Sequence, residues 1–168
     1  FLSVFSVGIG AGSLACNSLL KGEVSGRYVP WAAVGMSVAS VLLYFVSVRE
    51  APLPGTPEIG IAAFLGSPQN LAVLLCLLSI SFFGGLYIVP LYAIIQSRSE
   101  ESRMARVIAC TNIMVSLFMV LSAVGTTALL AMGVSIPHTF LVMAILTVIA
   151  AVLIRRTVHD QMRGRGTL

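Results

Sequence analysis

The sequence has 168 residues, of which 58% are hydrophobic and 10% are charged, and its formal net charge is +4. Soluble domains usually carry about 25% charged residues, and a mean hydropathy of +1.01 leaves too little polar sequence to cover a water-soluble globule. The composition argues against a soluble enzyme or a nucleic-acid-binding domain and indicates a chain whose solvent is lipid.

Five apolar stretches are each close to the length of about 20 residues that a helix needs to cross the hydrocarbon core of a bilayer. In chain order they cover residues 1–20, 28–48, 71–96, 107–132 and 136–154. Strands of a membrane barrel would instead alternate in segments of about ten residues. We therefore expect an all-α membrane protein with five transmembrane helices, in which residues 1–154 form the helical bundle and residues 155–168 form a basic cytoplasmic tail.

The charged residues all lie between or after these stretches. Nine of the ten Lys and Arg residues fall in the first connection, the third connection and the tail. Because cytoplasmic loops carry the excess of Lys and Arg, we expect these three segments, including the C-terminus, to be cytoplasmic. The first helix would then enter from the outside, which requires an earlier membrane segment, so we expect the chain to be a fragment of a longer protein.

Small and polar residues follow single helical faces in several stretches. The first stretch contains Gly8, Gly10 and Gly12, which would let a neighbouring helix approach closely. Two other stretches each carry a polar face, which either lines a substrate path or packs against other helices: Ser37, Ser40, Tyr44 and Ser47 in the second, and Asn112, Ser116, Ala123 and Thr127 in the fourth. The fifth stretch has only Thr139 and Thr147 in its interior and is expected to face lipid.

The third stretch contains Gly84, Gly85 and Pro90, and a proline removes one backbone hydrogen bond from a helix. Tyr92 and Gln96 follow one turn apart. Together with the polar face of the fourth stretch, this segment supplies the candidate substrate-path residues, which are Tyr87, Tyr92, Gln96, Asn112 and Ser116.

Other kinds of site have no support in the sequence. No charged residue lies at the centre of a stretch, where proton relays and voltage sensors usually carry one. The cysteines Cys16, Cys76 and Cys110 are far apart, and His138 and His159 are interpreted as loop and tail residues. We expect no metal, no cofactor, no catalytic residues and no nucleic-acid partner.

Residues 12–27, which end in Gly26 and Arg27, resemble the cytoplasmic signature loop of the major facilitator superfamily in its second copy, between helices eight and nine. The resemblance suggests a cytoplasmic gate between two helix bundles, with Asn17, Lys21, Glu23 and Arg27 as candidates. The acid that the family usually has is either replaced by Asn17 or displaced to Glu23. The alternative for Lys21 and Arg27 is that they only set the membrane topology.

Residues 84–96, the basic loop after them and residues 106–112 resemble helices ten and eleven of the bacterial lysophospholipid transporter family. The same segment is similar to the membrane half that is fused to 2-acylglycerophosphoethanolamine acyltransferase. The resemblance covers essentially the whole chain and implies helices 8–12 of a twelve-helix transporter in the bacterial inner membrane. It also implies lysophospholipids of the lysophosphatidylethanolamine class as the substrate, with membrane lipid, the preceding helices of the same protein and an acyltransferase domain or partner as associates.

Three alternatives remain open. The chain could belong to a facilitator for another solute or a drug, to the membrane half of a fused acyltransferase, or to a membrane scaffold. Acyltransferases of membrane glycerolipids use a His followed five positions later by Asp, whereas Met143 and Gly164 stand five positions after the two histidines. We therefore expect these residues themselves not to form an enzyme.

Overall fold

The computed structural model describes residues 2–20, 25–48 and 64–164, with side chains as far as Val152. These residues form the helices α1 (Leu2–Leu20), α2 (Val29–Val48), α4 (Pro68–Ser97), α5 (Met104–Ala131) and α6 (Ile136–Gly164), and the short 3₁₀ helix η1 (Glu101–Arg103) before α5. No strand occurs within these ranges. The predicted all-α fold with five helices is confirmed.

Four of the helices are long and apolar enough to cross a membrane, namely α1, α2, α4 and η1 together with α5. The 30 residues of α4 extend for about 45 Å at 1.5 Å per residue, which exceeds the hydrocarbon thickness of about 30 Å. The apolar part of α6 is Ile136–Val152. This helix continues past the bundle boundary predicted at residue 154 and ends at Gly164, so part of the basic tail is helical.

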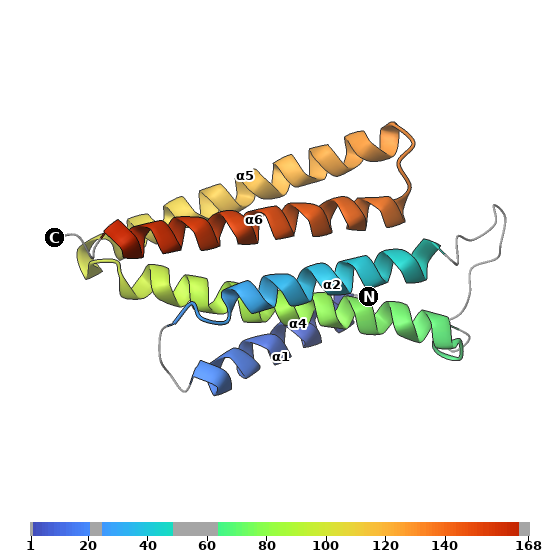
Figure 1. The fold of residues 1–168 in the computed structure, drawn as a ribbon, viewed down its shortest axis with the longest axis horizontal. Coiled ribbons are helices and arrows are strands. Elements are labelled where there is room, and N and C mark those ends of the chain that lie inside the picture. Colours follow the sequence, from blue (N-terminus) through green and yellow to red (C-terminus); the bar gives the residue numbers. More distant parts are fainter. Residues whose placement is uncertain (1, 21–24, 49–63, 165–168) are drawn as a thin grey trace.

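The helices lie side by side in one row, in the order α5, α6, α2, α4, α1 (Figure 1). The extensive contacts join α1 to α4, α4 to α2 and α2 to α6, whereas α5 touches α6 only slightly. The helices run roughly parallel or antiparallel to one another, and one end of the bundle holds the end of α1, the start of α2, the α4–α5 connection and the end of α6 (Figure 1). The described residues before α2, between α4 and α5, and at the end of α6 therefore bring their basic residues together at that end.

Glycines allow α1 and α4 to pack with their backbones close together. Gly8 and Gly12 are buried, and a Cβ on Gly12 would collide with the carbonyl oxygen of Phe82. From the other side, a Cβ on Gly85 would lie 2.5 Å from the carbonyl oxygen of Ile9. Such close approach through small residues is a common basis of helix association in lipid. The prediction for Gly8 and Gly12 is confirmed, whereas Gly10 faces open space.

A small core lies where α1, α2 and α4 meet. Cys16 of α1, Ala32 of α2 and Leu86 of α4 are buried together, and Phe83 and Tyr87 pack against them. Each helix contributes one residue to this cluster, so α4 is held between α1 and α2 by apolar packing.

Helix α6 packs along α2 through a small residue. Ala144 is 3% exposed and lies with Ser37 of α2 beside the same groove. Ser37 and Ser40 are also buried, and their hydroxyls donate to the carbonyls of Ala33 and Met36 within α2. Ser37 and Ser40 of the predicted polar face therefore serve packing. The expectation that the fifth stretch only faces lipid is wrong for the face of α6 that contacts α2.

Gly133 ends α5 and turns the chain toward α6. Its φ of 84° lies in the left-handed region that glycine adopts without steric cost. The backbone N–H of Val134 donates to the carbonyl of Leu129, and that of Gly133 donates to the carbonyl of Leu130. This pair of bonds is the Schellman motif, and it fixes the direction in which α6 leaves α5.

Candidate functional site

The three candidate residues on α4 lie in different environments. Tyr87 is half-buried and packs against the core cluster of Cys16, Ala32 and Leu86. Tyr92 is half-buried and Gln96 is exposed, one turn further along the helix. Since a helix turns by about 100° per residue, Tyr87 and Tyr92 point to faces roughly 140° apart. Tyr87 therefore contributes to packing, and Tyr92 and Gln96 form a separate polar face.

The two candidates on α5 lie on a helix that the described part of the chain leaves uncovered. No residue of α5 is buried. In the described part of the chain, the side chains of Asn112 and Ser116 form no hydrogen bond, although the hydroxyls of Thr111 and Thr127 donate to carbonyls of their own helix. We call the exposed line Asn112, Ser116, Ala123 and Thr127 the α5 polar stripe.

A cleft of about 510 Å³ separates α5 from α6. Its walls are mainly apolar, but three hydroxyl groups reach it, two from α5 and one from α6: Ser122, Thr126 and Thr139. The α5 side of the cleft is roughly 140° around the helix from the polar stripe. Helix α5 thus presents one polar-edged apolar face to α6 and a second polar face to the outside of the row.

The structure does not bring the candidate residues into one site. Helices α4 and α5 make no extensive contact within the described residues, and α2 and α6 lie between them in the row (Figure 1). Tyr92 and Gln96 therefore lie on α4 within the row, whereas Asn112 and Ser116 lie on α5 at the edge of the row. A shared substrate path requires further elements that face both helices.

The candidate gate lies only partly within the described residues. Asn17 is exposed in the last turns of α1, and Arg27 is exposed just before α2, where its backbone N–H donates to the hydroxyl of Ser25 at 3.4 Å. Lys21 and Glu23 lie outside the described residues. Within the described ranges, the only ion pair is Arg103 with Glu100 at 3.4 Å. Both side chains are exposed, so this pair contributes little to stability.

One polar cluster was not predicted from the sequence. The Tyr44 hydroxyl lies 3.4 Å from Nε2 of His138, and the Ser135 hydroxyl lies 2.7 Å from Nδ1 of the same ring. The rings of Tyr44 and His138 also meet edge to face, with centroids 5.2 Å apart. His138 was interpreted as a loop residue, yet it is the third residue of α6 and joins α6 to α2. Alternation of the spans puts the end of the second and the start of the fifth on one side of the membrane, which is the only signal for this contact.

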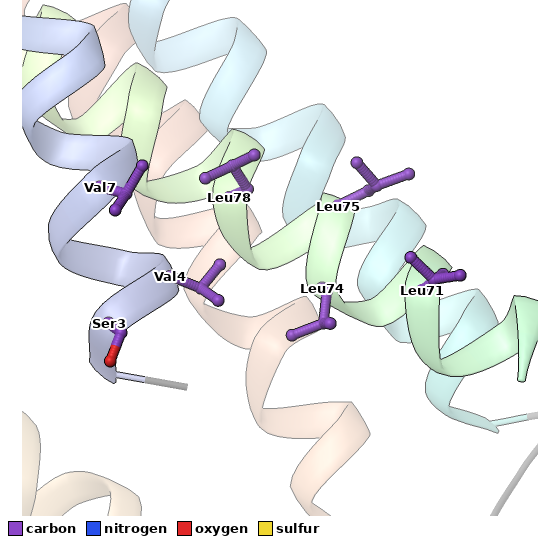
Figure 2. Close-up of a pocket in the computed structure, with 7 residues that line it drawn as sticks. All are labelled: Ser3, Val4, Val7, Leu71, Leu74, Leu75 and Leu78. Atoms are coloured by element: carbon purple, nitrogen blue, oxygen red, sulfur yellow. The ribbon is translucent and has the colours of Figure 1, made fainter. Parts of the chain in front are cut away.

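Two further grooves have almost purely apolar walls. The groove between α1 and α4 has a volume of about 320 Å³, and Ser3 supplies its only polar side chain (Figure 2). The groove between α2 and α6 has a volume of about 470 Å³ and extends along α2 from Val34 to Phe45. Grooves of this kind on membrane-length helices offer surface to acyl chains and no groups for chemistry.

The sequence matches no protein-family model, and comparisons with curated proteins and with solved structures gave no match.

Proposed function

We propose that this chain supplies helices 8–12 of a secondary transporter that moves lysophospholipids across the bacterial inner membrane by alternating access. The observation that carries the proposal is the α5 polar stripe, an uncovered line of polar and small residues on a helix long enough to span the membrane. An amide such as that of Asn112 costs several kcal/mol, roughly, in hydrocarbon when it has no hydrogen-bond partner. The stripe therefore favours a position on a polar path or against further helices.

The open row of helices is consistent with this proposal. Transporters that work by alternating access place their substrate near the bilayer midplane, between two helix bundles that rock against each other. Helix α5 at the edge of the row would face the other bundle, formed by preceding helices of the same protein. The resemblance of residues 84–112 to the lysophospholipid transporter family points in the same direction.

The chemistry of α5 suits an amphiphile better than an ion or a sugar. Its cleft with α6 combines apolar walls with hydroxyls from Ser122, Thr126 and Thr139, and the sequence places no charged residue at the centre of any span. An apolar surface would accept an acyl chain, and hydroxyl and amide groups would accept a small polar head group. Tyr92 and Gln96 would contribute to the same path from α4.

The proposal is tested by water accessibility along α5. In a variant that lacks Cys16, Cys76 and Cys110, single cysteines replace Asn112 and Ser116, and matched controls replace Leu117 and Val124. The control side chains are also exposed, at 50% and 63%, but they lie on another face of the helix. Because only the thiolate reacts and it needs water to form, a membrane-impermeant maleimide should label positions 112 and 116 and spare 117 and 124.

Transport in proteoliposomes is the second part of the test. The complete transporter, which includes the preceding helices, should move labelled lysophosphatidylethanolamine. Tyr92→Ala, Gln96→Ala and Asn112→Leu should each reduce this movement by about tenfold or more. Equal labelling of all four cysteine positions would refute the polar path. Transport of a cationic dye or a sugar in place of the lysolipid would support a transporter with a different substrate, which is the alternative facilitator function.

A further inference from the structure

We propose that the outer face of the α2–α6 pair holds a phospholipid, with one acyl chain in the α2–α6 groove and the phosphate on the cluster of Tyr44, Ser135 and His138. This site lies on different helices from the α5 polar stripe and does not depend on the transport proposal. The polar cluster, its continuity with the groove and the length of the groove support this site.

The polar cluster can bind an external anion because it has at least one O–H donor that no group within the cluster accepts. A neutral imidazole has one N–H donor and one acceptor nitrogen, and each hydroxyl can both donate and accept. The hydroxyl that accepts the imidazole N–H keeps its own proton for another acceptor. When the imidazole is protonated, both hydroxyls accept from it and both keep a proton to donate. In either state, Tyr44 and Ser135 offer at least one O–H to a phosphate oxygen, and the protonated ring adds a complementary charge.

The cluster is continuous with the groove. The ring of Tyr44 contacts that of Phe45, with centroids 5.4 Å apart, and Phe45 lines the groove. The cluster of Ser135, His138 and Tyr44 therefore lies at the end of the groove that Phe45 lines, and the apolar walls continue inward from there toward Val34. This is the order of polarity along a phospholipid, from phosphate to acyl chain.

The groove has the length and surface of a site for one acyl chain. From Val34 to Phe45 it extends for about 16 Å at 1.5 Å per residue, close to half of the hydrocarbon thickness of about 30 Å. Its walls expose large apolar side chains, among them Val38 at 53% and Ile145 at 53%. Buried Ser37 and Ala144 form its narrow floor, so a chain can lie close to both helix backbones.

The experiment compares two lipids on the full chain purified in detergent. Dioleoylphosphatidylglycerol and dioleoylglycerol have the same acyl chains, but only the first has a phosphate. Native mass spectrometry counts the lipid molecules that the protein retains. The expected result is one retained phosphatidylglycerol per chain and about tenfold weaker retention of dioleoylglycerol, because hydrogen bonds to a charged group are the strong ones.

Variants then separate the two halves of the site. Tyr44→Phe and His138→Gln should reduce phosphatidylglycerol retention by about tenfold and leave dioleoylglycerol unchanged, since only the phosphate contacts are lost. Val38→Trp should reduce the retention of both lipids because it fills the groove. The matched control is Leu75→Trp, which fills the groove between α1 and α4 shown in Figure 2 and should change neither.

Two outcomes would overturn the proposal. Equal retention of the two lipids by the unmodified protein would show that the polar cluster does not bind phosphate, and this comparison requires no variant to fold. Unchanged retention in Val38→Trp would show that the acyl chain lies elsewhere. Val38 is half exposed, so its replacement leaves the packing of α2 intact.

Discussion

Close backbone contact between α1 and α4 depends on individual glycines, and neighbouring glycines in the same helix do not share the role. Gly12 faces the carbonyl of Phe82, whereas nothing lies within 4 Å of a Cβ built on Gly10. Two residues along a helix are about 200° apart, so the two glycines point to nearly opposite sides. The same contrast holds on α4, where Gly85 meets α1 and Gly84 does not.

Alanine at Gly12 and alanine at Gly10 should therefore have different effects on stability. We expect Gly12→Ala to lower the free energy of unfolding by about 1–3 kcal/mol, because the added methyl group must push the helix backbones apart. Gly10→Ala should leave it unchanged or raise it by up to about 1 kcal/mol, since alanine is the better helix former. Unfolding by sodium dodecyl sulfate in mixed micelles measures both values, and an equal loss in the two variants would contradict the close contact.

At the scale of the element, α6 and α5 differ although they form one hairpin. Helix α6 is fixed to α2 along one face through buried Ala144, and the contact between Tyr44 and His138 joins the two helices near the start of α6. Helix α5 has no comparable attachment within the described residues. The Schellman turn at Gly133 holds the hairpin together, so α5 can present two faces to other partners.

The attachment of α6 predicts a position-dependent effect of added bulk. Ala144→Leu should lower the thermal stability of the protein in detergent, at a cost of about 1–3 kcal/mol, because three extra carbon atoms do not fit between the helices. Ala150→Leu is the matched control on an exposed position of the same helix and should stay within about 0.5 kcal/mol. Melting followed by circular dichroism distinguishes them, and equal melting temperatures would argue against the α2–α6 packing.

At the scale of the whole molecule, the described parts of the basic connections lie at the same end of the helices (Figure 1). The excess of Lys and Arg at that end predicts a cytoplasmic position. A reporter inserted between Arg98 and Arg103 and one fused after Leu168 should therefore both be cytoplasmic, and a reporter after Glu50 should be on the opposite side. Alkaline phosphatase and green fluorescent protein fusions report the two sides. The same side for the reporters after Glu50 and Leu168 would exclude this topology.

Local patterns were sufficient to predict the helices but not their neighbours. Hydropathy is a property of consecutive residues, so the five apolar stretches agree with α1, α2, α4, α5 and α6 to within a few residues at most ends. The order of the row depends on contacts between distant segments. Tyr44 and His138 are 94 positions apart, and no pattern within either stretch indicates that the helices adjoin.

Helical faces were predictable only in a relative sense. The spacing of Asn112 and Ser116 places them on one side of a helix, but spacing does not say whether that side meets a neighbour. The comparable face of α2, with Ser37 and Ser40, is buried, whereas that of α5 is open. Likewise, the glycines of the first stretch indicated close packing without indicating which of them lies at the contact. These differences follow from the tertiary arrangement, which the local sequence does not encode.

The position of α4 between α1 and α2 has a consequence for synthesis. Helices α1 and α2 both pack on α4 and make no extensive contact with each other within the described residues, yet both precede it in the chain. During translation, α1 and α2 are therefore made before α4, and their packing on α4 is complete only after Ser97, the last residue of α4, has been synthesised. A nascent chain arrested before that point would lack the surface of α4 against which Gly8 and Gly12 of α1 pack.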